Sequence, residues 1–431
     1  MFYSGSLYIV VTHHSMLEKV ITVGLVLPEL SRGIAEEHLD ELEKLIETAG
    51  GAVVEKILAR RQAPDPATFV GSGKAEEVKQ LAERLQATLV VFDDDLSPAQ
   101  ARNLEKIISA KVIDRSGLIL DIFAGRARSR EAKTQVELAQ LEYLLPRLTR
   151  AWTHLERQAG GIGTRGVGET QLELDRRIIR TRIAHLKREL TKIERQRDTQ
   201  RKSRNAVFTV ALVGYTNAGK STLFNQLTRG GAEAIDKLFA TLDAKSQRAA
   251  FEMPRETVIV DTVGFLRKLP HHLVASFRST MEEAVAADLV LHVIDVSHPQ
   301  FEDQRAVGDE VLKDLGVDAG RVIEVYNKAD RGEHLDVRRR DAVTISALTG
   351  RGIERLVDAI REREMREGEV MHLDIPHGEA RLLAQLFELA EVLDKRVDDV
   401  HTHVTAWVPR DVMSRFESFA AADLLETAKV S

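Results

Sequence analysis

The sequence has no cysteine, no long apolar segment and no excess of positive charge, and each absence excludes a class of protein. Without cysteine there are no disulfides, thiolate metal sites or cysteine nucleophiles, which fits a reducing compartment. No apolar run approaches the roughly 20 residues that a membrane-spanning helix requires. The formal net charge of −6 argues against a surface that is basic throughout and binds nucleic acid by charge alone. We therefore expect a cytoplasmic, monomeric protein with no membrane span.

The first residues do not have the features of a signal peptide. They contain a short apolar patch, Leu7–Val11, but neither a basic leader nor a small-residue cleavage site. Translation from Met1 and from Met16 are both compatible with this sequence. A chain of 431 residues is too long for one ordinary hydrophobic core, so several domains are expected.

Residues 19–123 alternate between segments typical of strands and segments typical of helices. Strands are expected at 19–27, 52–58, 88–92 and 111–114, and helices at 34–49, 74–85 and 97–108. Ser97 followed by Pro98 is typical of a helix start. Such alternation predicts a parallel sheet flanked by helices.

Two short motifs in this region each have two interpretations. Gly71-Ser72-Gly73-Lys74 looks like half of a phosphate-binding loop, but without the full spacing a turn before a helix explains it better. Asp93-Asp94-Asp95 ends a strand, where carboxylates can bind a metal ion. Because three consecutive side chains point in different directions, we expect a solvated loop there instead.

Glycine is concentrated between two expected helices. Gln135–Leu148 has apolar residues at helical spacing, and a second helix is expected over Thr170–Arg204. Between them, Gly160–Gly168 contains five glycines in nine residues, with Arg165 near the middle. A loop so poor in side chains can lie close to a nucleic-acid backbone. The alternative is a flexible linker.

The second of these helices is strongly basic. Residues 171–205 carry 12 Lys and Arg against 5 Asp and Glu, a net charge of +7 in an acidic chain. Such a local excess is the electrostatic footprint of a nucleic-acid site, although many charged helices are simply solvated. With the glycine-rich loop beside it, we favour RNA, with Arg165, Arg176, Arg177 and Arg180 as the contacting residues.

One motif dominates the second half of the chain. Gly214-Tyr215-Thr216-Asn217-Ala218-Gly219-Lys220-Ser221 has the G-x-x-x-x-G-K-S spacing of a P-loop, between an apolar strand and a helix start. Backbone N–H groups of such a loop point at one spot and favour phosphate there. Lys220 is expected to reach the β- and γ-phosphates, and the Ser221 hydroxyl to bind Mg²⁺.

Further guanine-nucleotide elements follow in the expected order. They are Phe239-Ala240-Thr241-Leu242-Asp243, Asp261-Thr262-Val263-Gly264, Asn327-Lys328-Ala329-Asp330 and Ser346-Ala347-Leu348. Thr241 is expected to contact Mg²⁺ and sense the γ-phosphate, Asp261 to stand behind the Mg²⁺ ligands, and the Gly264 N–H to contact the γ-phosphate. The Asp330 carboxylate can accept two hydrogen bonds from guanine that adenine cannot donate. The sequence therefore predicts GTP and GDP as ligands, with Lys220, Thr241 and Gly264 in catalysis.

Two positions in the nucleotide site concern hydrolysis. Phe265 follows D-x-x-G, where many GTPases have the glutamine that orients the attacking water, so unaided turnover should be slow. Asn217 occupies the P-loop position at which potassium-stimulated GTPases carry asparagine. Its side-chain carbonyl is a candidate K⁺ ligand; the alternative is an asparagine that stabilises the turn.

A small unit is expected after the nucleotide-binding residues. Strands are expected at 370–375 and 402–408, and helices at 380–396 and 409–419. No chemistry is evident in it.

The chain resembles the HflX family of ribosome-associated GTPases over about residues 19–425. The motifs that carry the resemblance are Phe69–Lys74, Ser97–Gln100, Gln135–Leu148, Gly160–Arg165, Gly214–Thr222, Phe239–Asp243 and Asp261–Phe265. The resemblance implies binding to the large ribosomal subunit, with the glycine-rich loop near ribosomal RNA of the peptidyl-transferase region. It also implies GTP-driven separation of stalled subunits, and ATP binding by the N-terminal region, in which Gly71–Lys74 would take part.

The fold class expected is α/β, with a P-loop GTPase domain between two other parts. We predict an N-terminal extension at 1–18, an α/β domain at 19–125, a helical hairpin with the glycine-rich loop at 126–205, the GTPase domain at 206–366 and a small α+β domain at 367–431. The function expected is a GTPase that splits or rescues ribosomes. A large-subunit assembly GTPase and a ribosome-binding module with negligible hydrolysis are the alternatives.

Overall fold

The computed structural model describes most of the chain. The described residues are 17–148, 171–202, 207–228, 239, 244–253, 255–268, 283–331, 342–410 and 412–421. The N-terminal extension, the glycine-rich loop with Arg165, and the segment Ala240–Asp243 lie outside these residues.

The described residues fall into two compact units. The first holds 17–148, 171–197, Phe239 and 266–268, and the second holds the remaining described residues. The division of the chain into five parts that the sequence analysis predicts is not tested by these two units and stays a prediction.

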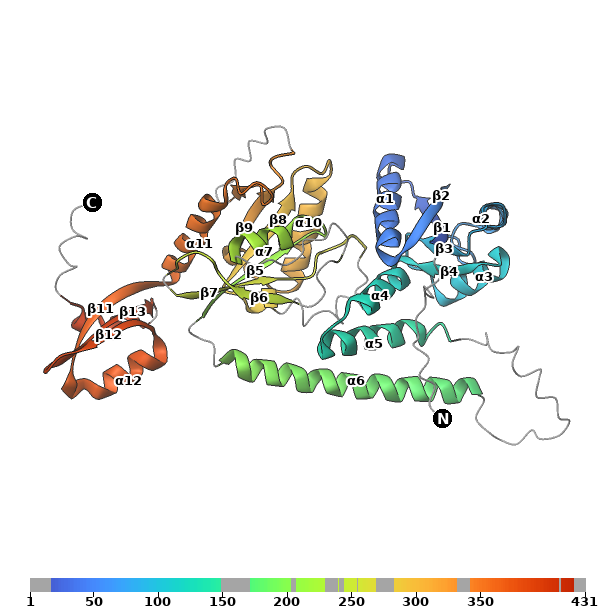
Figure 1. Cartoon of the computed structure of the whole chain (residues 1–431). Coiled ribbons are helices and arrows are strands. Elements are labelled where there is room, and N and C mark those ends of the chain that lie inside the picture. Colours follow the sequence, from blue (N-terminus) through green and yellow to red (C-terminus); the bar gives the residue numbers. More distant parts are fainter. Residues whose placement is uncertain are drawn as a thin grey trace. The chain divides into compact units, whose positions relative to one another are not determined.

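The first unit contains a parallel sheet with helices on both faces (Figure 1). The strands are β1 (Glu18–Val26), β2 (Gly51–Arg60), β3 (Leu89–Phe92) and β4 (Lys111–Asp114), in the order β2-β1-β3-β4. The helices are α1 (Arg32–Ala49), α2 (Ser72–Leu85), α3 (Pro98–Ile108) and α4 (Arg115–Arg126). Helices α1 and α4 pack on each other, as do α2 and α3. The expected parallel α/β arrangement is confirmed, because β1 pairs in parallel with β2 and β3, and β3 with β4. Side chains of the central strands such as Val23 and Phe92 are fully buried, as in other sheets covered on both faces.

Local sequence signals explain several of these boundaries. The Ser97 hydroxyl accepts from the Gln100 N–H at 3.2 Å, the Gln100 side chain accepts from the Ser97 N–H at 2.9 Å, and Pro98 occupies the first turn of α3. Such a capping box contributes about 1 kcal/mol. Gly71 caps α2 with φ of +88°, so the turn expected there is present, and Lys74 pairs with Glu77 at 2.6 Å.

One expectation for this unit was wrong, and one helix was not predicted. The helix α4 was not expected, because its sequence RSGLILDIFAGR is apolar on most sides and lacks clear periodicity. The loop Asp93–Asp95 is not solvated as a whole, because Asp93 is only 2% exposed and pairs with Arg115 at 2.7 Å. Arg115 is itself buried and lies 22 residues away in sequence, so no local pattern announces the pair.

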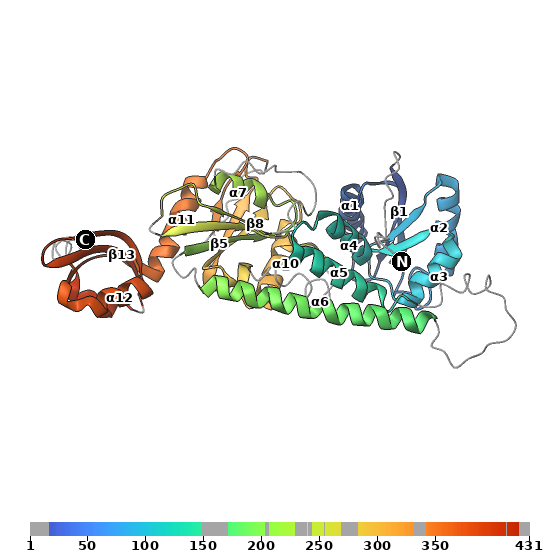
Figure 2. The same ribbon diagram turned by 60° about the horizontal axis from the view of Figure 1, so that its bottom comes forward.

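Two helices form the hairpin expected from the leucine pattern (Figure 2). They are α5 (Arg130–Leu144) and α6 (Gln171–Lys202). Leu186 is buried at their seam, and ion pairs join Arg182 to Glu137 at 2.7 Å and Lys187 to Glu142 at 2.8 Å. Part of the positive charge of α6 is therefore balanced by carboxylates of α5.

The second unit is built around a mostly parallel sheet. Its strands are β5 (Val207–Gly214), β6 (Lys245–Arg248), β7 (Glu256–Asp261), β8 (Leu289–Asp295), β9 (Val322–Asn327) and β10 (Ala342–Thr344), in the order β10-β9-β8-β5-β7-β6. Only β6 among these runs antiparallel to its neighbour. The helices α7 (Lys220–Thr228), α10 (Phe301–Asp314) and α11 (Ile353–Glu367) accompany the sheet (Figure 1). The parallel strands bring the ends of β5, β7, β8 and β9 to one edge, where nucleotide ligands bind in open α/β sheets.

The end of the chain forms an antiparallel sheet with one helix. Strands β11 (Gly368–Pro376), β12 (Glu391–Val397) and β13 (His401–Pro409) pair in the order β11-β13-β12, with α12 (Ala380–Leu389) against them. The helix expected at 380–396 is therefore wrong in its second half, where residues pair with β13 instead. The helix expected at 409–419 is also wrong, since only two short 3₁₀ turns, Met413–Arg415 and Glu417–Phe419, are present.

Arg255 is buried in the second unit, where it contacts residues of α11 and β13. Its guanidinium lies 3.7 Å from the Trp407 ring and its Nε is 3.1 Å from the buried carboxylate of Glu364. Burial raises the pKa of Glu364, although the Arg255 charge opposes the shift. In the described part of the chain, no helix is both long and apolar enough to cross a membrane.

Candidate nucleotide site

Two glycines allow the P-loop to close tightly. Gly214 has φ of +146°, and a side chain there would place its Cβ 2.1 Å from the Val293 carbonyl oxygen. Gly219 has φ of +94°, and its Cβ would lie 2.2 Å from the Asn327 amide nitrogen. Both backbone conformations are strained for other residues, so glycine is required on steric grounds.

The P-loop lysine is buried beside the backbone that precedes it. Lys220 Nζ donates to the carbonyl oxygens of Gly214 at 3.1 Å and Tyr215 at 2.9 Å, and the residue is 7% exposed. Burial lowers the pKa of Lys220 to about 8, and the Asp261 carboxylate opposes that shift. An ammonium held in so dry a site interacts strongly with an arriving anion.

The structure brings together two of the three groups expected at the magnesium site. Ser221 Oγ donates to Asp261 Oδ2 at 2.8 Å, and Asp261 is fully buried at the end of β7. Mg²⁺ prefers oxygen ligands. A hydroxyl can bind the ion directly, and a carboxylate can hold that hydroxyl or a bound water in place. No cluster of three or more His, Asp or Glu that could hold a metal occurs among the described residues. The Ser221 hydroxyl and the Asp261 carboxylate fit an ion that takes its other ligands from phosphate and water.

The D-x-x-G segment lies directly on the P-loop. Phe265 donates its N–H to the Gly214 carbonyl at 2.9 Å and accepts from the Thr216 N–H at 2.7 Å. A Cβ on Gly264 would come within 2.8 Å of both Lys220 Nζ and Thr216 Cα. The Phe265 side chain is 2% exposed, and phenylalanine has no group that could orient a water.

The residues expected to read the base meet at the ends of β9 and β10. Asp330 accepts from the Ser346 hydroxyl at 2.6 Å, and this bond is the main cause of the lowered pKa of Asp330. The carboxylate is therefore ionised at neutral pH. Leu348 is 68% exposed, which leaves an apolar side chain beside this loop.

Asn327 ties the base-reading loop to the P-loop. Its Nδ2 donates to the Ala218 carbonyl at 2.8 Å, and its Oδ1 accepts from the Ala347 N–H at 2.9 Å. Sequence reasoning missed the partner of Lys328, which is Asp295 at 2.7 Å. Asp295 ends the parallel strand β8, and that position at the ligand edge of the sheet was a signal that could have identified it.

Asn217 stands at the tip of the P-loop. It is exposed and has φ of +64°, a left-handed conformation that asparagine tolerates better than most residues. Asparagine at this position therefore stabilises the left-handed turn of the P-loop. Its side chain is exposed and so stays accessible to an ion.

Phe239 has a different environment from the one expected. It is 2% exposed, and its ring packs edge-on against Phe123 of the first unit with centroids 4.7 Å apart. Its side chain therefore belongs to a core and does not face a nucleotide. Ala240, Thr241, Leu242 and Asp243 lie outside the described residues, so their expected contacts remain predictions.

Sequence models of three protein families match successive parts of the chain. One described as GTP-binding GTPase N-terminal matches residues 36–124, and one described as GTP-binding GTPase Middle Region matches 126–204. A third, described as 50S ribosome-binding GTPase, matches 209–328, which includes the P-loop and the first two residues of the N-K-x-D motif.

Curated relatives extend over nearly the whole chain. The GTPase HflX of Magnetococcus marinus is 44% identical over 415 residues, covering 94% of this chain and 95% of the relative. The GTPase HflX of Escherichia coli K12 is 47% identical over 365 residues, covering 83% and 86%. A solved GTP-binding protein of Sulfolobus solfataricus in complex with GDP has 25% identity and a TM-score of 0.43, covering 80% of this chain and 98% of that one.

Proposed function

The chain belongs to the HflX family of GTPases, and from that premise we propose that it binds the large ribosomal subunit and uses GTP to separate or rescue stalled ribosomes. Family membership makes it an enzyme that hydrolyses GTP, so the alternative of a module with negligible hydrolysis is set aside. We place its action in the cytoplasm, where ribosomes work.

Each part of the nucleotide site has a proposed role. Lys220 neutralises charge on the β- and γ-phosphates, and Ser221 and Thr241 bind Mg²⁺, with Asp261 holding the Ser221 hydroxyl in place. The Gly264 N–H contacts the γ-phosphate, and Asp330 reads guanine. Support for this assignment is the Ser221–Asp261 bond and the position of Gly264 against Lys220.

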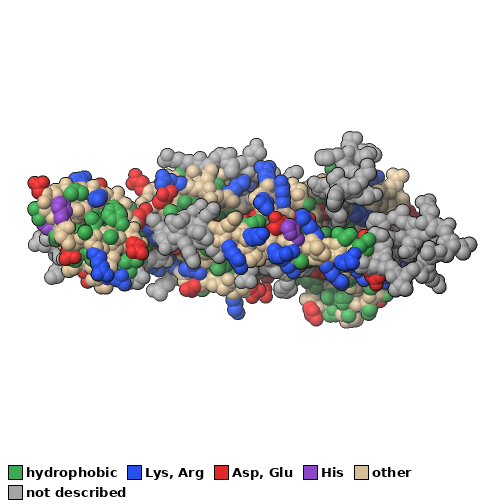
Figure 3. Space-filling model, turned by 90° about the horizontal axis from the view of Figure 1, so that it is seen from below, with side chains coloured by type: hydrophobic (Ala, Val, Ile, Leu, Met, Phe, Trp, Pro, Cys, Tyr) green, Lys and Arg blue, Asp and Glu red, His purple; other side chains and the backbone are tan. Residues whose placement is uncertain are grey.

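The observation that carries the ribosome proposal is the outer face of α6. Among the described residues, the exposed Lys and Arg of α6 are Arg177, Arg180, Arg182, Lys187, Arg188, Lys192 and Arg195. Figure 3 shows Lys and Arg side chains gathered along this face. Carboxylates of α5 pair with Arg182 and Lys187, and all seven side chains are exposed. A basic row on an acidic protein suits the phosphate backbone of RNA.

Arg176 differs from its neighbours in the proposed RNA surface. It is half-buried, and its guanidinium donates to the Leu148 carbonyl at 2.8 Å. Replacing it would remove the hydrogen bond to the segment that follows α5 as well as the charge, so Arg177 and Arg180 are better probes. The roles of Arg165 and the glycine-rich loop stay part of the proposal.

Sedimentation of intact ribosomes with the protein and a non-hydrolysable GTP analogue tests this function. We expect ribosomes to separate into subunits, with the protein bound to the large one. Replacing Arg177, Arg180 and Arg188 by glutamine should weaken binding and reduce its logarithmic salt slope by about one for each phosphate that is no longer neutralised. Replacing Arg84, Arg102 and Lys106, exposed on α2 and α3, removes the same charge and should change neither. Intact ribosomes at saturating protein would refute the proposal, as would equal effects in both variants.

We also propose that K⁺ supports hydrolysis through the Asn217 side chain. A monovalent cation near the bridging phosphate oxygens would supply positive charge in place of an arginine finger. Hydrolysis by the ribosome-stimulated protein should be about tenfold faster in K⁺ than in Na⁺, and Asn217→Ser should remove the difference while leaving GTP affinity within about threefold. Equal rates in the two salts would leave Asn217 with its role in the turn alone.

A further inference from the structure

The Thr216 side chain carries a buried hydroxyl without a hydrogen bond. Thr216 is the third residue of the P-loop and is 7% exposed. Its Oγ1 has no hydrogen-bond partner in the part of the chain that the structure describes. Burying a hydroxyl without a partner costs free energy, because the bond to water is lost and nothing replaces it. At a ligand site, such a group is accounted for by a partner that arrives with the ligand.

The neighbouring hydroxyls of the site are already engaged. Ser221 Oγ donates to Asp261 at 2.8 Å, and Thr262 Oγ1 donates to a backbone carbonyl of β5 at 2.6 Å. The Phe265 side chain has no hydrogen-bonding group at the position after D-x-x-G. Of the three hydroxyls of Thr216, Ser221 and Thr262, the one on Thr216 is therefore uncommitted.

Backbone contacts place Thr216 against the D-x-x-G segment. The Thr216 N–H donates to the Phe265 carbonyl at 2.7 Å, and Tyr215 forms a parallel β-bridge with Phe265. Thr216 Cγ2 lies 2.9 Å from the point at which a Cβ of Gly264 would stand, and Lys220 Nζ lies 2.8 Å from the same point. The side chains of Thr216 and Lys220 therefore both lie beside Gly264.

Rotation about one bond brings the Thr216 hydroxyl to this position. Oγ1 and Cγ2 are both attached to Cβ, so a χ1 change of about 120° puts Oγ1 where Cγ2 now lies, in another staggered rotamer. The backbone stays in place, held by the hydrogen bond to the Phe265 carbonyl. A hydroxyl beside Gly264 and Lys220 can then both donate and accept a hydrogen bond.

We propose that the Thr216 hydroxyl positions the attacking water of GTP hydrolysis, a task that the Phe265 side chain cannot perform. In this reaction the water oxygen forms a bond to the γ-phosphorus. The bond from that phosphorus to the β-phosphate oxygen breaks, its electron pair stays on GDP, and both protons of the water leave with the released dihydrogen phosphate. The hydroxyl accepts a hydrogen bond from the water and donates one to a γ-phosphate oxygen, which directs the water oxygen at phosphorus.

The proposal rests on the proposed place of the γ-phosphate beside Lys220 and Gly264, and it is independent of any action on ribosomes. The test measures single-turnover GTP hydrolysis by the purified full-length chain without ribosomes. Two pairs of chains differ within each pair only in the hydroxyl. The unaltered chain and Thr216→Val share the branched side chain, and Thr216→Ser and Thr216→Ala both lack the methyl group.

Hydrolysis should be about tenfold slower in Thr216→Val than in the unaltered chain, the effect of one hydrogen bond between neutral groups. Thr216→Ala should be slower than Thr216→Ser by a similar factor, and this pair provides the same comparison if Thr216→Val does not fold. Affinity for a fluorescent non-hydrolysable GTP analogue should stay within about threefold, because the lost contact acts on the water in the transition state.

Thermal unfolding separates this role from a structural one. Thr216→Val removes an unpaired buried hydroxyl, so it should unfold at the same temperature as the unaltered chain or a higher one. Thr228→Val is the matched control. Thr228 is 8% exposed on α7, and its hydroxyl donates to the Phe224 carbonyl at 2.7 Å, so its replacement should leave the hydrolysis rate unchanged.

Three results would overturn the role of Thr216. They are an undiminished rate in Thr216→Val, a rate in Thr216→Ser as low as that in Thr216→Ala, and a loss of analogue affinity equal to the loss of rate. Lys220→Ala distinguishes these from a wrong position of the γ-phosphate. Normal hydrolysis in Lys220→Ala would refute the nucleotide-site assignment, whereas slow hydrolysis there with a normal rate in Thr216→Val would refute the role of Thr216 alone.

Discussion

GTP hydrolysis by a Lys220→Ala variant is expected to fall by about a hundredfold or more, with the fold retained. The lysine supplies positive charge in a buried site, and removal of one such preorganised group typically costs that much. Its ammonium is held by two backbone carbonyls in the present structure, and burial has already lowered its pKa to about 8. Removing a poorly compensated buried charge should not reduce stability by more than about 1 kcal/mol. Phosphate release and thermal unfolding measure the two quantities.

Ser221→Ala serves as the companion variant, since it removes the hydroxyl bonded to Asp261 but keeps Lys220. It should lower hydrolysis and make it less sensitive to the Mg²⁺ concentration. The exposed Lys313→Ala is the control and should behave as the unaltered protein does. Full activity in Ser221→Ala would show that Mg²⁺ is held by other groups.

Asp330→Asn is expected to exchange guanine for xanthine as the preferred base. The carboxylate accepts from the N1–H and 2-amino group of guanine, whereas an asparagine amide can instead donate to the 2-oxo group of xanthine. GTP affinity should fall by about a hundredfold, and the XTP to GTP ratio should reverse. Asp330 is a better position than Asn327 for testing base recognition, because Asn327 also donates a hydrogen bond to the Ala218 carbonyl of the P-loop.

Nucleotide titrations with GTP, XTP and ATP measure this change. Asp318→Asn is the matched control, an aspartate that caps a 3₁₀ turn in the same unit. If GTP affinity survived in Asp330→Asn, the base would be read by other residues.

Motifs made of neighbouring residues could be recognised in the sequence because their chemistry is local. The P-loop needs a strand, two glycines with positive φ and a helix start within one short stretch, and the structure has all of them. The capping box of α3 likewise involves residues three apart. The order of the nucleotide elements follows from the same logic, because parallel strands bring their carboxyl ends to one edge.

Expectations failed where the partner lies far along the chain. Residues 391–397 look helical by composition, yet they form a strand because they pair with β13. The net charge of the basic helix is a second case. Arg182 and Lys187 pair with carboxylates of α5, and the charge counted over residues 171–205 alone does not include these carboxylates.

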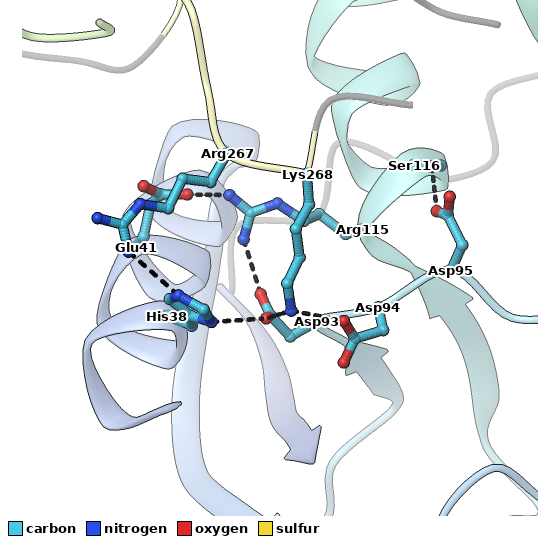
Figure 4. Close-up of polar contacts among 9 residues, drawn as sticks. All are labelled: His38, Glu41, Asp93, Asp94, Asp95, Arg115, Ser116, Arg267 and Lys268. Carbon is cyan, nitrogen blue, oxygen red and sulfur yellow. Dashed lines mark hydrogen bonds and ion pairs between the residues drawn. The ribbon is translucent and has the colours of Figure 1, made fainter. Parts of the chain in front are cut away.

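Asp93 shows most clearly where local sequence information ends and long-range packing takes over. Three consecutive aspartates after a strand specify a polar turn at the edge of a parallel sheet, and nothing more. Their environment is set by Arg115, 22 residues away, and by Lys268, 175 residues away. Burial removes the water that would otherwise solvate the carboxylate, so only groups delivered by the fold can balance it. The GTPase motifs were therefore recognisable in the sequence, whereas the pairing of Asp93 with Arg115 and Lys268 is decided by the tertiary structure (Figure 4).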